Sequence, residues 1–96
     1  MNPYVGVWVG PDEYTAEVQY TVTESAIGLS VAAHDPSDGE VANVGDVNFS
    51  DGVLSFVATW PSTGRVCRCE LRLVDQSTLD LTFTYTDRAR LVRKPA

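Results

Sequence analysis

Two cysteines separated by one residue, Cys67 and Cys69, are the side chains of this sequence best suited to chemistry. Thiolates act as metal ligands, as redox partners and as nucleophiles. Arginines lie on both sides of the pair in the segment GRVCRCELRL, residues 64–73. A nearby guanidinium favours the thiolate form of a cysteine. The spacing of the two cysteines then decides which of these chemistries is available.

That spacing favours burial. At positions i and i+2 of a strand, Cys67 and Cys69 point to one face, together with Leu71 and Leu73, so we expect them to line an apolar interior. Such positions hold two sulfurs at a separation and orientation unsuited to a disulfide. A zinc site needs further ligands, and the single histidine, His34, lies at a strand end beside a turn. We therefore predict no metal and no cofactor, and keep a reactive thiol inside a cavity as an alternative.

Tyrosine hydroxyls are the second group of candidates. General acid–base catalysis needs a titratable group inside a cavity. Tyr14, Tyr20 and Tyr85 fall on the inward face of predicted strands and are our candidate hydrogen-bond donors or catalytic acids. His34 and Asp35 lie at one rim, in a segment whose Asp, Pro and Gly residues are typical of a solvated turn. The sequence contains no catalytic-triad order, paired-carboxylate motif or glycine-rich phosphate loop.

Alternation of apolar and polar residues predicts the strands that position these side chains, and no helical period accompanies it. We expect eight short strands, at residues 4–9, 13–25, 27–33, 41–49, 53–60, 67–73, 77–85 and 88–94. The turns HDPSDGE, SDG and STG are of hairpin length, so each strand should pair antiparallel with its sequence neighbour.

The inward faces supply a list of candidate ligand contacts. It comprises Asn43, Phe56, Trp60, Cys67, Cys69, Leu71, Leu81 and Phe83. Asn43 belongs to the weakly patterned strand 41–49, where we place Val41, Gly45, Val47 and Phe49 on the same face. A register slip of one residue would exchange the two faces of that strand.

One apolar face and one face rich in threonine and charge, kept over eight strands, predict an all-β fold with residues 1–96 in a single domain. The simplest arrangement is an antiparallel up-and-down meander that closes into a small barrel, because closure removes the exposed edges. An orthogonal or aligned sandwich of two sheets is the alternative.

The segment Gly6-Val7-Trp8 resembles the GxW signature that begins the first strand in the calycins, the superfamily of lipocalins, fatty-acid-binding proteins and avidins. The resemblance implies a lipocalin-like barrel whose closed end holds Trp8 under a basic side chain of the last strand. Arg93 is the first choice for that cation–π contact and Arg90 the second. The chain is shorter than a typical lipocalin and shows neither a second lipocalin motif nor a C-terminal helix, so the family's binding of apolar molecules transfers only as a tendency.

Net charge limits the partners. A formal charge of −6 argues against a nucleic-acid partner. No apolar run is long enough for a membrane span, and the opening MNPYVGVWVG lacks the basic start of a secretory signal, so we expect a soluble, unprocessed, cytoplasmic chain. Residues 1–64 carry −9 and residues 65–96 carry +3, which suits either charge pairs between neighbouring strands or complementary faces for self-association.

Three functions fit these observations. The first is binding of a small apolar or aromatic molecule inside the barrel. The second is a cofactor-independent cyclase or isomerase that uses the same cavity, a reaction type found among small calycin-like barrels. The third is an interaction module with a filled barrel, in which Val5, Val7 and Val9 face outward from the first strand and form a homodimer surface.

Overall fold

The computed structural model describes residues 2–11 and 18–95. In these residues the chain forms seven strands and no helix: β1 (Gly6–Trp8), β2 (Gln19–Ser25), β3 (Gly28–His34), β4 (Asn43–Ser50), β5 (Val53–Trp60), β6 (Arg65–Asp75) and β7 (Thr78–Thr86). Tyr14, one of the candidate catalytic tyrosines, lies outside the described residues. No helix in the described part of the chain is long and apolar enough to cross a lipid bilayer.

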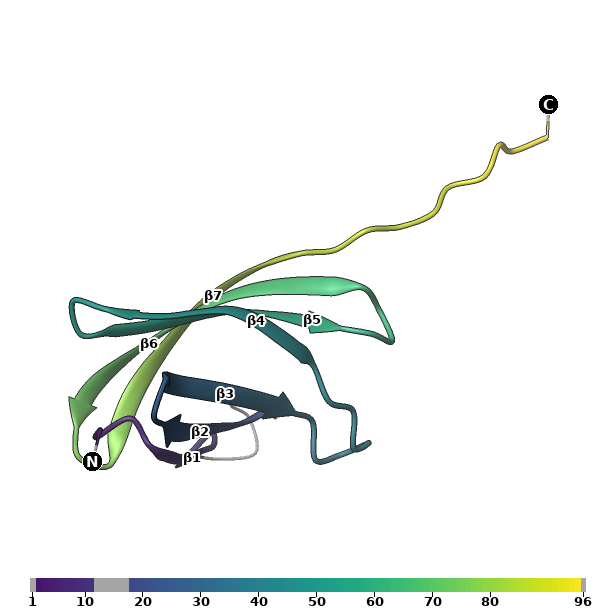
Figure 1. Cartoon of the computed structure of the whole chain (residues 1–96). Helices are drawn as coiled ribbons and strands as arrows, with labels where there is room; N and C mark the ends of the chain where they lie inside the picture. The colour runs from purple at the N-terminus through teal and green to yellow at the C-terminus, as the bar shows by residue number, and fades with distance from the viewer. Residues whose placement is uncertain (1, 12–17, 96) are drawn as a thin grey trace.

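The strands form two antiparallel sheets, one of three strands in the order β1-β2-β3 and one of four in the order β4-β5-β6-β7. An isolated bridge between His34 and Val41 joins the end of β3 to the segment just before β4. Figure 1 shows the four-stranded sheet curving over the three-stranded one. The predicted all-β antiparallel architecture is therefore confirmed, and closure of the two sheets into one barrel stays a prediction.

The core lies between the two sheets. On β5, Leu54, Phe56, Ala58 and Trp60 are buried and every intervening residue is half-buried, as the alternating pattern predicts. Val22, Val31 and Ala33 face them from the three-stranded sheet. Cross-strand partners share a face, so the pairing of Ala58 with Cys67 and of Phe56 with Cys69 extends this interior onto β6.

Tyr4 fastens the N-terminal segment to the four-stranded sheet. Its side chain is buried, and its hydroxyl donates to the carbonyl oxygen of Gly52 at 2.6 Å and accepts from the backbone N–H of Leu73 at 3.0 Å. Trp8 is half-buried and donates its ring N–H to the carbonyl oxygen of Tyr4 at 2.8 Å. The inward placement predicted for Trp8 agrees with this arrangement.

Strand β4 corrects the prediction for Asn43. Asn43 is exposed, whereas Ala42 is buried and Val44 is half-buried. Val44 pairs with the buried Ala58, and this register turns Asn43 outward. An irregularity between Gly45 and Asn48 then shifts the register, so Phe49 pairs with the buried Leu54 at the other end of the strand. Before the bulge the even-numbered residues of β4 face the core, and after it the odd-numbered residues do. No single face of this strand therefore points inward along its whole length.

The strand predicted at residues 27–33 begins one residue later, at Gly28. Ser25 pairs with Gly28, so Ala26 and Ile27 form the two-residue turn between β2 and β3. Ile27 is consequently 98% exposed and does not join the inward face of Leu29, Val31 and Ala33.

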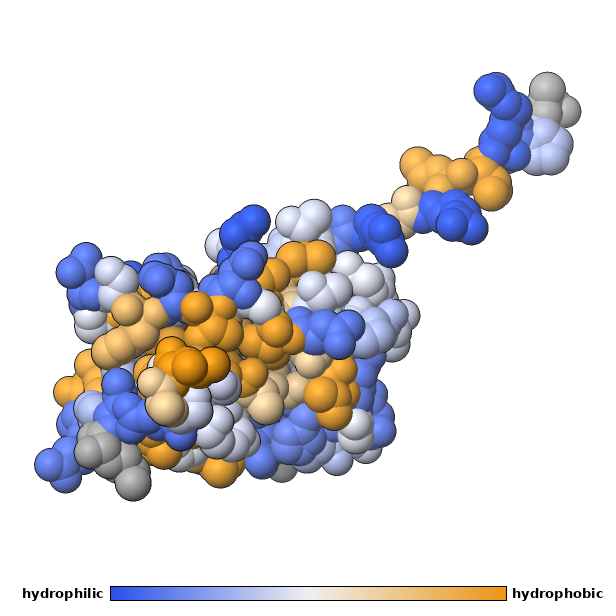
Figure 2. Space-filling model, in the orientation of Figure 1, coloured by the Kyte–Doolittle hydropathy of each residue, from blue (hydrophilic) through white to orange (hydrophobic). Residues whose placement is uncertain are grey.

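The eighth strand predicted over residues 88–94 is absent. Residues 87–95 form no strand and extend away from the sheets beyond β7 (Figures 1 and 2). Arg93 is exposed on this extension and, among the described residues, makes no cation–π contact with Trp8. Four basic residues in seven repel one another and favour water, and the few apolar groups between them offer little burial to offset the entropy of ordering.

Candidate functional site

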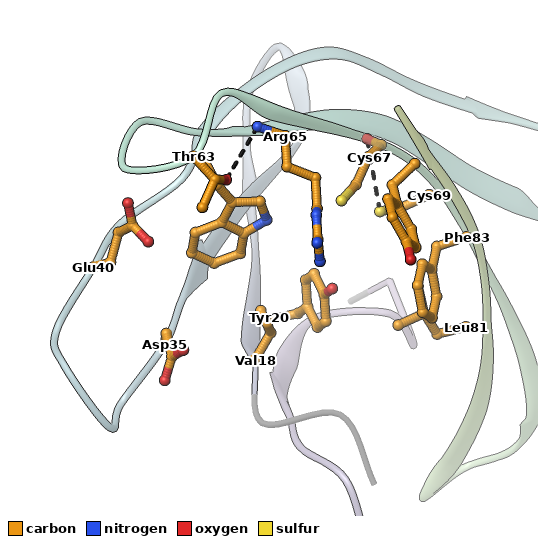
Figure 3. A pocket seen from close by; sticks show the side chains of 12 residues that line it. Val18, Tyr20, Asp35, Glu40, Thr63, Arg65, Cys67, Cys69, Leu81 and Phe83 are labelled. Atoms are coloured by element: carbon orange, nitrogen blue, oxygen red, sulfur yellow. Dashed lines mark hydrogen bonds between the residues drawn. The ribbon is translucent and has the colours of Figure 1, made fainter. Parts of the chain in front are cut away.

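A partly enclosed cavity of about 290 Å³ lies between the two sheets. Figure 3 shows its lining side chains converging from both sheets and from two loops. The described lining consists of four aromatic residues, two thiols, two aliphatic residues and a polar rim: Tyr20, Trp60, Phe83, Tyr85, Cys67, Cys69, Val18, Leu81, Asp35, Glu40, Thr63 and Arg65.

The register of the four-stranded sheet sets the inner wall of the cavity. Cys67 pairs with Tyr85, and Cys69 pairs with Phe83, so all four side chains project from one face of β6 and β7. Tyr20 approaches from β2 in the opposite sheet, with its ring 5.8 Å from that of Phe56. The alternation that builds the core therefore also builds the cavity.

Arg65 crosses the rim of the cavity. Its guanidinium carbon lies 4.3 Å from the centre of the Tyr85 ring, which is cation–π distance. The same guanidinium donates twice to the Asp87 carboxylate, from Nη2 at 2.8 Å and from Nε at 3.1 Å. These hydrogen bonds lower the pKa of Asp87 and raise that of Arg65, so the pair stays charged. The rim thus presents a held cation against an aromatic face.

Two loops are tied together at the other side of the rim. The Glu40 carboxylate accepts from the backbone N–H of Ser62 at 2.8 Å and from its hydroxyl at 2.9 Å, which connects the β3–β4 loop to the β5–β6 turn. Asp35 accepts from the hydroxyl and the N–H of Ser37, and these bonds lower its pKa. Both carboxylates are therefore fixed at the mouth and not in the interior.

The two thiols behave as apolar lining. Burial, with a smaller contribution from Cys67, raises the pKa of Cys69 to about 12. Burial also raises the pKa of Cys67, although Arg65 opposes that shift. Both cysteines are free thiols. Across residues 2–11 and 18–95, no three His, Cys, Asp or Glu side chains gather in a way that could hold a metal ion.

Tyr20 brings a polar group into this apolar setting. Burial of its ring is the main cause of its raised pKa, and the two thiols add to the shift. The phenol therefore stays protonated at neutral pH and can donate a hydrogen bond to a molecule in the cavity.

No protein-family model, curated protein or solved structure matches this chain.

The structure brings together seven of the residues that the sequence selected for the site: Tyr20, Trp60, Cys67, Cys69, Leu81, Phe83 and Tyr85. Phe56 and Leu71 are buried in the core and do not line this cavity. Asn43 faces away from the interior. Trp8 and Arg93 lie apart from the cavity lining, Trp8 at the core and Arg93 on the extended segment.

Sequence reasoning placed Asp35 at a rim but missed Glu40, Thr63 and Arg65. Arg65 lies two residues before Cys67, and Asp87 lies two residues after Tyr85. Because alternate residues of a strand point to the same face, both could have been predicted beside the cavity. Glu40 had no comparable signal, because its position depends on the course of the β3–β4 loop.

Proposed function

We propose that this protein binds a small apolar or aromatic molecule in the cavity between its two sheets. The observation that carries the proposal is Phe83. It shares the inner face of β6 and β7 with the buried residues Cys69 and Leu71 and lines the cavity, yet it is 50% exposed. A soluble fold gains free energy when such an aromatic surface is covered, at about 25 cal/mol per Å².

The size and chemistry of the cavity are consistent with such a ligand. Its volume of about 290 Å³ lies just below the range of typical ligand pockets, about 300 to 1,000 Å³. Aromatic rings from three strands supply contact area, and the Tyr20 phenol supplies an orienting hydrogen bond. The proposal needs a lined hollow between curved sheets and does not need complete closure into a lipocalin-like barrel.

A cyclase or isomerase is the second candidate, and the protonated Tyr20 phenol is the observation that favours it. Held in an apolar cavity, a phenol can donate a hydrogen bond to a developing negative charge while the walls fix the conformation of a flexible substrate. For any molecule found to bind, Tyr20→Phe should abolish product formation in a mass-spectrometric assay while retaining binding. Product formation that persists in this variant would remove the catalytic role of Tyr20.

The binding proposal is tested with N-phenyl-1-naphthylamine, a neutral aromatic probe whose fluorescence rises in apolar surroundings. We expect saturable binding at one probe per chain, with energy transfer from Trp60. Phe83→Ala should weaken binding by about five- to thirtyfold, the effect of losing about 1–2 kcal/mol of aromatic contact.

Phe49→Ala is the matched control. Phe49 is exposed to a similar degree, 45%, but packs edge-on against Tyr4 and does not line the cavity. Its substitution should leave the dissociation constant unchanged. Non-saturable binding, or equal weakening in both variants, would count against a ligand site at this cavity.

A further inference from the structure

The segment that follows β7 differs in charge from the rest of the molecule. Residues 88–94, which we call the basic tail, contain Arg88, Arg90, Arg93 and Lys94 and no acidic residue. Since the whole chain carries −6, the tail carries +4 and the remaining residues carry −10. A tail of this charge is attracted electrostatically to the acidic remainder of another copy of this chain.

The basic tail also has the pattern of a strand without a partner. Ala89 and Leu91 continue the parity of Phe83 and Tyr85, while Arg88 and Arg90 continue the outer face of β7. Leu91 is 89% exposed, and Figure 2 shows the apolar atoms of the tail standing clear of the body. An alternating extended segment with exposed aliphatic groups is typical of a strand that pairs only in an assembly.

A sheet edge suited to such a strand lies directly before the tail. β7 is the last strand of the four-stranded sheet and, among the described residues, pairs with β6 alone. One side of β7 therefore presents unpaired backbone N–H and C=O groups, which can template a further strand. The inner face of the same strand carries the half-exposed Phe83 and Tyr85.

We propose that the basic tail of one chain adds antiparallel to the open edge of β7 in a second copy of this chain, which returns the same contact. The result is a two-fold dimer in which the two four-stranded sheets become continuous. Because the two-fold axis is perpendicular to the sheet, the odd-numbered residues of β7 and of the basic tail lie on the same face in both copies. Ala89 and Leu91 of one copy then lie on the inner face of the joined sheet, beside Phe83 and Tyr85 of the other.

A second copy is the occupant that the charges favour. Nucleic acid and anionic lipid would also attract the tail, but the −10 of the remaining chain repels both. Another copy offers a free strand edge on a body that is negative overall, with nine of its acidic residues in residues 1–64. The tail thus finds on its neighbour the backbone partners that neither segment has among residues 2–11 and 18–95 of a single chain.

Sedimentation equilibrium of the full chain tests the proposal, and we expect a dimer that dissociates on dilution and at high salt. Leu91→Asp should raise the dissociation constant of the dimer by about tenfold or more, because it places a carboxylate against an apolar face. Ile27→Asp is the matched control. It introduces the same charge at an equally exposed aliphatic residue, 98% exposed, in the turn between β2 and β3, and should leave the dissociation constant unchanged.

Hydrogen exchange provides a readout that does not depend on mass. In the dimer, backbone amides of residues 88–94 should be protected, and the protection should disappear on dilution or in Leu91→Asp. A monomer with protected tail amides would show that the tail pairs within its own chain, which overturns the proposal. A dimer unaffected by Leu91→Asp would place the interface elsewhere, for example on Val5, Val7 and Val9, and overturns it equally.

Discussion

Tyr4 shows how one hydroxyl can join distant parts of this chain. Because its buried side chain bonds both Gly52 and Leu73, Tyr4→Phe leaves these two backbone groups without this partner. We expect a loss of about 1–3 kcal/mol in the free energy of unfolding, measured by urea denaturation. Tyr85→Phe is the control, since Tyr85 is half-exposed and its change should cost less than about 0.5 kcal/mol. Equal effects of the two variants would refute the role assigned to Tyr4.

Single residues also show how far the sequence predicts the site. Parity along a strand sufficed for Cys67, Cys69 and Phe83, because no irregularity separates them on β6 and β7. It failed for Asn43, because a bulge in β4 exchanges the inward set part-way along the strand. Bulges depend on backbone geometry that alternation does not report, so this error could not be corrected from the sequence alone.

At the scale of elements, the turns at residues 39, 52 and 64 hold glycines in the left-handed region. Gly39 and Gly64 have φ of +76° and +74°, which other residues adopt at a cost. Gly39→Ala and Gly64→Ala should each lower the free energy of unfolding by about 1 kcal/mol. A Cβ at Gly64 would lie 3.0 Å from the Arg88 side chain, but a flexible arginine can move aside, so the two costs should be similar.

Gly45 on β4 provides the comparison for these turns. Its φ is not positive, and a Cβ there would meet nothing within 4 Å. Gly45→Ala should therefore be neutral or slightly stabilising in the same urea titration. If it costs as much as the two turn variants, strain at φ is not the cause of their loss.

Turn positions were easier to predict than the pairing of the last segment. The β4–β5 and β5–β6 hairpins have the pairing that their turns indicate, because Asp51-Gly52 and Thr63-Gly64 specify where the chain reverses. The strand expected at residues 88–94 has the right alternation but lacks a partner within the described chain. Alternation reports the conformation that a segment favours and not the presence of a neighbouring strand.

At the scale of the whole molecule, buried neutral acids predict a loss of stability at high pH. The pKa of Cys69 rises from 9.0 to about 12 on folding, and those of Cys67 and Tyr20 also rise. Below about pH 9 these groups are protonated in both states and contribute no pH dependence. Above it the unfolded chain releases protons that the folded chain retains, so the free energy of unfolding should fall between about pH 9 and 12.

Urea titrations between about pH 9 and 12 test whether the free energy of unfolding falls and which groups cause the fall. Combining Cys69→Ala with Tyr20→Phe should flatten the decline, whatever the variant's stability at neutral pH. A decline of unchanged slope would assign the effect to other groups. The acid side serves as the control, because the lowered pKa values of Asp35, Asp75 and Asp87 make stability fall only as these carboxylates become protonated.

Within each sheet, every strand pairs with its neighbour in sequence, so hairpins can form one after another with short loop closures. Tyr4 is different, because its hydroxyl reaches backbone groups 48 and 69 residues away. Its docking is the step with the largest loop to close and should follow formation of the hairpins. In stopped-flow experiments, Tyr4→Phe should then accelerate unfolding and leave the refolding rate nearly unchanged. The contacts of the N-terminal segment would thus determine how long the folded state persists before it unfolds.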